Sequence, residues 1–157
     1  MLAIRRYEEA DHDEVWALHN RALAESGAHA GTGPWDDDLH EIATIYLAAG
    51  GEFLVGVLDG WLVAMGALRR TAPDRAEIKR MRVDPAFQRR GFGAAILSAL
   101  ERRAADLGCL TLYLDTTTIQ VAAQRLYLAH GYREVGRSVV GGFDTILYEK
   151  QLAHTPT

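Results

Sequence analysis

The stretch EIKRMRVDPAFQRRGFGAAIL, residues 77–97, changes its pattern twice. It begins as a strand of mixed apolar and charged residues, which is predicted to end at Pro85 because proline has no N–H for the sheet. It ends in an apolar helical pattern that runs from Phe92 to Leu107. Between strand and helix lies QRRGFG, residues 88–93. This order of strand, glycine loop and helix raises the question of whether the loop binds phosphate.

The QRRGFG loop has the chemistry of an anion site. The first N–H groups of a helix have no acceptor within the helix and carry a partial positive charge. Gly91 and Gly93 leave that backbone accessible, and Gln88, Arg89 and Arg90 add donors beside it. An arginine fork can pair with two phosphate oxygens. The loop therefore favours binding of a diphosphate, although a simple glycine turn into the helix with two solvated arginines would have the same sequence.

Two other phosphate-binding loops compete for this segment. A dinucleotide site would combine the glycines with Asp115 at the end of the next strand, but its third small residue would fall at Ile96. Isoleucine is too large for the close helix–strand packing of that fold, so the dinucleotide alternative fits poorly. A Walker loop would need Gly-Lys followed by Ser or Thr, which the segment lacks.

Length and composition place this loop in an ordinary globular protein. The chain has 157 residues, 48% of them hydrophobic and 24% charged, which suits one domain over residues 1–152 with a loose tail at 153–157. The acidic N-terminal segment does not resemble a secretory signal, and no apolar run could span a bilayer. We therefore expect a cytoplasmic location without membrane contact. The net charge of −4 argues against nucleic-acid binding.

The remaining patterns predict a mixed α/β or α+β domain. A first strand, LAIRRYE, is followed by two expected helices, one ending near residue 26 and one from Asp36 to Gly50. Asp59-Gly60 marks a tight hairpin between two apolar strands. Further expected elements are a strand at 75–85, a helix at 91–108, a strand at 109–116, a helix at 121–132, and strands at 133–137 and 143–152.

A second motif narrows the choice of ligand. The segment YLDTTTIQVAAQRLYLAHGY, residues 113–132, follows the glycine loop by one strand. Together the two segments resemble the GNAT superfamily of N-acetyltransferases. Its acetyl-CoA loop, Gln/Arg-x-x-Gly-x-Gly/Ala after Val-x-Pro, and its Ala-x-x-Leu-Tyr-x-x-x-Gly-Phe/Tyr signature are matched by Val83, Pro85, Gln88, Gly91, Gly93, Ala123, Leu126, Tyr127, Gly131 and Tyr132.

The resemblance implies a fold and a cofactor site. The fold is a mixed, mostly antiparallel sheet of six to seven strands with about four helices, whose central strands splay apart at the site. The cofactor is acetyl-CoA, released as CoA. Gln120 stands where the family often has asparagine. The residues implied in cofactor binding are Met81, Arg82 and Val83, through their backbone groups, together with Gln88, Arg89, Arg90, Gly91, Phe92, Gly93, Ala94, Gln120 and Tyr127.

The resemblance also implies two catalytic residues. Glu77 matches a general-base glutamate of the histone-acetyltransferase branch, although a surface carboxylate paired with Lys79 is an equal alternative. Tyr127 is suited to return a proton to the departing thiolate. Strand alternation is expected to place Arg80 and Arg82 opposite Glu77, in solvent, with pairing to surface carboxylates or contact with an acidic substrate as alternatives. The aspartates at 36–38 begin a helix or attract an amine.

The expected reaction is direct transfer of an acetyl group to a primary amine of a small molecule or peptide in a ternary complex. An acetyl-cysteine route is not expected because Cys109, the only cysteine, begins a buried strand. No metal is expected. A non-catalytic acyl-CoA sensor and a dinucleotide-binding oxidoreductase stay as alternatives. The residues do not identify the amine, and they leave a homodimer open.

Overall fold

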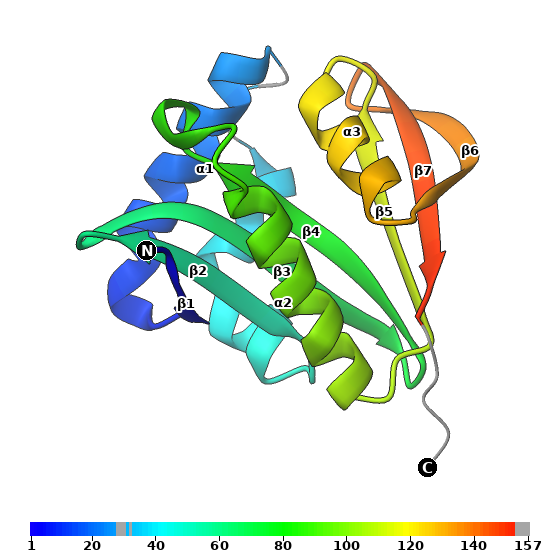
Figure 1. The fold of residues 1–157 in the computed structure, drawn as a ribbon, viewed down its shortest axis with the longest axis horizontal. Coiled ribbons are helices and arrows are strands. Elements are labelled where there is room, and N and C mark those ends of the chain that lie inside the picture. Colours follow the sequence, from blue (N-terminus) through cyan, green and yellow to red (C-terminus); the bar gives the residue numbers. More distant parts are fainter. Residues whose placement is uncertain (28–30, 32, 153–157) are drawn as a thin grey trace.

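The protein is built around one seven-stranded sheet. The computed structural model describes residues 1–27, 31 and 33–152, so the expected tail at 153–157 lies outside the described residues. The strands follow the order β1-β2-β3-β4-β5-β7-β6 (Figure 1). Their bounds are β1 Ala3–Arg6, β2 Glu52–Leu58, β3 Trp61–Ala72, β4 Arg75–Val83, β5 Thr111–Thr117, β6 Arg133–Val140 and β7 Phe143–Gln151.

Helices cover both faces of this sheet. Helices α2 (Phe92–Asp106) and α3 (Val121–Ala129) pack on one face, in a core that includes Ile96, Leu100 and Tyr127. Helix α1 (His12–Ser26) packs on the other face through a second core that includes Leu18. Short 3₁₀ turns form η1 (Glu9–Asp11), η2 (Pro34–His40) and η4 (Pro85–Phe87).

The second helix expected after the first strand is not a regular α-helix. Its segment divides into the 3₁₀ helix η2 and the π-helix η3, Ala43–Leu47. Side-chain contacts explain the division: Asp36 is buried against His19, and Asp38 bonds both Arg80 and the Tyr46 hydroxyl. These tertiary contacts override the helical pattern that the sequence alone suggests.

The sheet is antiparallel except between its two central strands. The only parallel pair is β4 with β5, so the doubly wound fold of dinucleotide-binding enzymes does not fit the part of the chain that the structure describes. The predicted hairpin at Asp59-Gly60 is confirmed, with φ of 50° and 83° at the two turn residues.

The parallel pair is short because β4 leaves β5. Its register runs only from Arg75↔Thr111 to Glu77↔Tyr113, after which β4 and β5 diverge (Figure 1). The register between β3 and β4 shifts at Gly66, where Met65 faces Arg82 and Ala67 faces Lys79. The predicted splay of the central strands is therefore confirmed; it begins after Glu77, and the bulge of β4 follows between Lys79 and Arg82.

The bulge corrects the expected placement of Arg80 and Arg82. Arg80 has a φ of 58°, and the extra residue at this point reverses the alternation of side chains along β4. Ile78 and Met81 both pack in the core beneath α2. Arg82 instead bonds His19 on α1, so Arg80 and Arg82 share the face of Glu77 rather than opposing it.

Gly66 is the residue that permits this packing. A Cβ built on Gly66 would lie 2.5 Å from Met81 Sδ and 2.7 Å from Ile96 Cγ2. We predict that Gly66→Ala lowers the free energy of unfolding by about 1–3 kcal/mol, because the core must move to admit a methyl group. Urea denaturation measures the effect. Gly136→Ala, whose Cβ would meet only Leu147 at an ordinary 3.4 Å, is the control, and equal effects of both changes would contradict the packing argument.

Candidate active site

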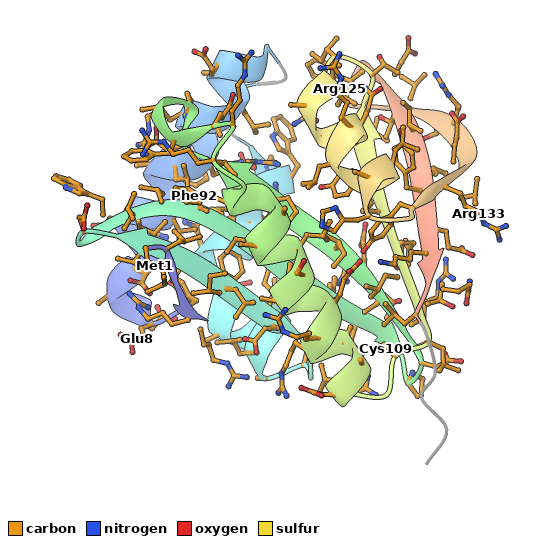
Figure 2. The ribbon with its side chains drawn as sticks, in the orientation of Figure 1. Met1, Glu8, Phe92, Cys109, Arg125 and Arg133 are labelled. Atoms are coloured by element: carbon orange, nitrogen blue, oxygen red, sulfur yellow. The ribbon has the colours of Figure 1, made fainter. Side chains whose placement is uncertain are left out.

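The divergence of β4 and β5 opens a cavity of about 320 Å³. Residues 77–82 of β4 form one wall, and Asp115, Thr116 and Thr117 of β5 form the other. Gln120, Ala123 and Tyr127 close it from the side of α3, and Leu23, Val140 and Thr145 complete the lining. Figure 2 labels Phe92 where α2 begins and Arg125 on α3, the helices on either side of the open part of β4 and β5.

The open edge of β4 offers hydrogen-bond donors to this cavity. Asp84 N–H donates to the Val63 carbonyl of β3 at 2.8 Å. Because N–H groups alternate in direction along a strand, those of Met81 and Val83 point away from β3. They therefore face the gap that β5 leaves, and an extended amide-bearing ligand could pair with them as a neighbouring strand would.

The glycine loop forms an anion cradle at the start of α2. Gly91 precedes the helix with a φ of 79°, and its carbonyl accepts the first intrahelical bond, from Ala95 N–H at 3.0 Å. The N–H groups of Phe92, Gly93 and Ala94 have no acceptor within the helix. Gln88, Arg89 and Arg90 are exposed beside them. The donors, the charge and the accessible backbone fit the pyrophosphate of a CoA thioester.

Gln120 takes part in the site with one end of its amide. Its Oε1 accepts from Thr117 Oγ1 at 2.9 Å and from Thr117 N–H at 3.3 Å. This fixes the side chain at the beginning of α3 and directs its oxygen toward β5. The Gln120 NH₂ group is left to donate toward the cavity, which the side chain lines.

Tyr127 is a buried phenol at the cavity wall. Its ring packs against Tyr132 and Tyr148, with centroids 5.7 and 6.1 Å away. Burial raises the pKa of the Tyr127 hydroxyl to about 12, an effect that the Arg82 charge reduces. The phenol therefore holds its proton at neutral pH, as a proton donor must.

Glu77 is partly buried at the end of the β4–β5 ladder. Burial raises the pKa of its carboxyl above the ordinary value, the Lys79 charge lowers it and the Asp115 charge raises it. A carboxyl with a raised pKa in a cavity is a candidate general base.

A network of charged side chains that the sequence did not predict connects α1, η2 and β4. His19 Nε2 bonds Asp36 at 3.0 Å, and its Nδ1 accepts from Arg82 Nε at 3.3 Å. Arg80 pairs with Asp38 and lies 3.6 Å from Asp36. Arg80 is therefore paired with carboxylates of the protein instead of being solvated, and Arg82 is held by His19. No sequence signal joined His19 to Arg82, because they lie on different elements.

The other predicted residues lie outside the cavity lining. Val83 and residues 88–94 are not among the residues that line it. Trp35 is 58% exposed, and its Nε1–H donates to the Gly31 carbonyl. Cys109 is buried at the far end of α2.

Within the described residues, no group of three His, Cys, Asp or Glu side chains could hold a metal, and no helix is both long and apolar enough to cross a membrane.

Sequence comparison connects this geometry to known proteins. The model of the acetyltransferase (GNAT) family matches residues 8–132. The chain belongs to this family. N-acetylaspartate synthetase of Mus musculus is 37% identical over 107 residues, which cover 64% of this chain and 34% of that protein. A ribosomal protein bS18-alanine N-acetyltransferase of Salmonella typhimurium is 35% identical over 72 residues, covering 46% of this chain and 49% of that protein. The chain thus spans about a third to a half of the curated relatives it matches.

Solved GNAT structures share the fold of the whole chain. An acetyltransferase from Staphylococcus aureus superposes with a TM-score of 0.89 at 21% identity, covering 98% of this chain and 100% of that one. The Salmonella typhimurium protein yncA, solved with its cofactor acetyl-CoA, superposes with a TM-score of 0.82 at 21% identity, covering 100% and 97%. The predicted resemblance to the GNAT family and its fold is therefore confirmed.

The burial of Glu77 predicts a pH-dependent cost in stability. Its folded pKa is raised, so the cost is absent at low pH, where the carboxyl is protonated in both states, and grows as pH rises through the folded pKa. We predict that Glu77→Gln increases the free energy of unfolding at about pH 7 but not at about pH 3. Urea denaturation at both pH values tests this. Asp37→Asn, at an exposed carboxylate, should gain nothing; a Glu77→Gln effect independent of pH would refute the explanation.

Proposed function

We propose that this protein transfers an acetyl group from acetyl-CoA to a primary amine of a small molecule or peptide, by direct attack in a ternary complex. The supporting observation is the cavity between β4 and β5, where an unpaired strand edge, a protonated phenol and a partly buried carboxylate meet. The anion cradle at α2 lies beside the same strand. The strand edge and the anion cradle would bind the CoA thioester, and the phenol and the carboxylate would transfer the protons.

Residues of β4, α2 and α3 would hold the donor. The open β4 edge at Met81 and Val83 would pair with the amides of its pantetheine arm. The N–H groups that begin α2, with Gln88, Arg89 and Arg90, would bind its pyrophosphate. Gln120 would donate its NH₂ group. When bound, acetyl-CoA supplies an acetyl thioester, which is reactive toward a neutral amine.

Glu77 and Tyr127 would carry out the two proton transfers of the reaction. An amine attacks only when neutral, and deprotonation at pH 7 costs about 4–5 kcal/mol for a lysine-like amine but about 1 kcal/mol for an α-amino group. Glu77 would accept this proton, through water where it does not reach the amine. Tyr127 would donate its Oη proton to the departing thiolate, and the N–H of Met81 or Val83 would stabilise the developing oxyanion.

The names of the relatives support both acceptor classes. One group is named for making N-acetylaspartate, and another for acetylating an alanine of ribosomal protein bS18. The first acceptor is a free amino acid and the second is part of a protein. Both reactions acetylate an amine, which agrees with the proton management proposed for this cavity.

A screen for CoA release tests the function. Purified protein is mixed with acetyl-CoA and a panel of amino acids, peptide N-termini, lysine peptides, polyamines and aminoglycosides. We expect release of free CoA, and a mass increase of one acetyl group on the accepted amine. Acetyl-CoA binding without turnover of any amine would favour a non-catalytic acyl-CoA sensor, whereas NAD(H) binding without CoA binding would overturn the assignment.

The anion cradle predicts the effect of a carboxylate at Gly91. We expect Gly91→Asp to reduce CoA affinity at least about tenfold in calorimetry, because its charge would face the pyrophosphate. Gly60→Asp is the matched control: Gly60 has a φ of 83° and, like Gly91, no atom within 4 Å of a built Cβ. The control carries the same backbone strain far from the cradle, so equal losses in both variants would contradict the pyrophosphate assignment.

The role of Tyr127 predicts a loss in kcat. We expect Tyr127→Phe to lower kcat by about 10²-fold while changing acetyl-CoA affinity much less, because only the proton donor is removed. Tyr148→Phe removes a hydroxyl from the neighbouring ring, which does not line the cavity, and serves as the control. Steady-state kinetics and calorimetry separate the two effects. An unchanged kcat, with chemistry shown to limit turnover, would exclude Tyr127 as the acid.

A further inference from the structure

The bulge in β4 gathers charges of both signs on one face of the cavity. Glu77, Lys79 and Arg82 lie on the face toward α1, and all three line the cavity. Asp115 of β5 lies across the gap from them. Because α2 and the glycine loop lie on the opposite face of the sheet, these charges face the side from which the acceptor would enter.

Arg80 is already neutralised by the protein. Its Nε donates to Asp38 Oδ2 at 3.0 Å, a second N–H donates to Asp38 Oδ1, and its NH1 lies 3.6 Å from Asp36. The side chain is only 12% exposed. Arg80 therefore acts as a structural cation that ties η2 to the bulge, and it offers little charge to a ligand.

Arg82 is held in place without a carboxylate partner. Its Nε donates to His19 Nδ1 at 3.3 Å and its NH1 to the Met81 carbonyl at 2.8 Å. Asp36 bonds the other ring nitrogen of this histidine, which holds the ring with Nδ1 toward Arg82. Among the described residues, no carboxylate forms an ion pair with Arg82.

The remaining N–H groups of Arg82 open into the cavity. A guanidinium has more N–H groups than these two acceptors use. Within the described part of the chain every buried side-chain nitrogen and oxygen has a partner, so the NH2 group of Arg82 is not fully buried, and the residue lines the cavity. Burial and the Arg80 charge lower the pKa of Arg82 to about 10, which leaves it charged at neutral pH.

The position of Arg82 sets the spacing of a ligand. Arg82 stands between Met81 and Val83, whose N–H groups face the gap where the thioester would lie. Arg82 and Met81 line the same cavity, so an anion on the Arg82 guanidinium would share that cavity with the thioester and the amine. Glu77 and Asp115 supply negative charge for the ammonium group on the same face. Positive and negative side chains thus line one cavity, as binding of an amino acid requires.

We propose that the acceptor is a free amino acid or closely related amine whose carboxylate is bound by the spare N–H groups of Arg82. This proposal rests on the proposed function, in which the amine of the bound acceptor receives the acetyl group. It distinguishes two acceptor classes, because a peptide N-terminus presents an amide where a free amino acid presents a carboxylate. A paired carboxylate would also offset the burial of the Arg82 charge.

The first test compares acceptors that differ only in this charge. Alanine, aspartate and phenylalanine are each assayed against the corresponding α-carboxamide, with spermidine as a cation without carboxylate. We expect kcat/KM to favour the free acids by about tenfold or more, the range of hydrogen bonds to charged groups. The amides have the more easily deprotonated amines, so intrinsic reactivity opposes the expected preference.

The second test removes the guanidinium group of Arg82. Arg82→Lys keeps the charge, and Arg82→Gln keeps part of the hydrogen bonding; Arg102→Gln, at an exposed arginine of α2, is the control. We expect both Arg82 variants to raise the KM of the free acid about tenfold or more and to reduce the preference over its amide, with acetyl-CoA affinity retained. Calorimetric binding of the N-acetyl amino acid to the CoA-loaded protein gives a readout without turnover.

The outcomes separate this inference from the proposed function. Turnover of amides or spermidine at least as fast as free acids overturns the carboxylate site and leaves acetyl transfer standing. Arg82-dependent binding of the N-acetyl amino acid without turnover supports the site and counts against catalysis. An unchanged acid-to-amide preference in folded Arg82→Lys and Arg82→Gln proteins would also reject the assignment.

Discussion

The bulge at Arg80 is the constraint on which the rest of the site depends. β4 pairs with β5 over three residues and then bulges by an extra residue opposite Gly66, and the cavity occupies the space between the two strands beyond their paired part. The same extra residue reverses the side-chain alternation, which brings Glu77 and Arg82 to one face. Gly66 allows Met81 to pack beneath α2 at this point. Core packing and site geometry therefore have one common cause.

The charges around the bulge serve both stability and chemistry. Asp36 and Asp38 compensate Arg80 and connect η2 to β4, while His19 orients Arg82 without neutralising it. A buried cation beside another cation is costly unless a partner arrives. The partly buried Glu77 carries a similar cost. Such local destabilisation is common at functional sites, where the rest of the fold compensates for it.

Sequence reasoning was accurate where the signal was local. The Asp59-Gly60 hairpin, the helix after QRRGFG and the strand ending before Pro85 each follow from nearby residues, and each is present. It failed where distant contacts decide the conformation. The segment after Asp36 splits into 3₁₀ and π turns because its side chains reach α1 and β4. Arg80 and Arg82 were misplaced because no local pattern marks the extra residue.

The sequence by itself determined the family, the order of strands and helices outside the segment after Asp36, and the glycine loop that begins α2, because these depend on residues close together in the chain. Only the tertiary structure decided which charges share the cavity. The distance from His19 to Arg82 in the chain is long, and their contact arises from α1 packing across the sheet. The change in side-chain alternation at Arg80 is visible only in the register between β4 and β3. The donor side of the site is thus encoded in local motifs, whereas the acceptor side arises from packing.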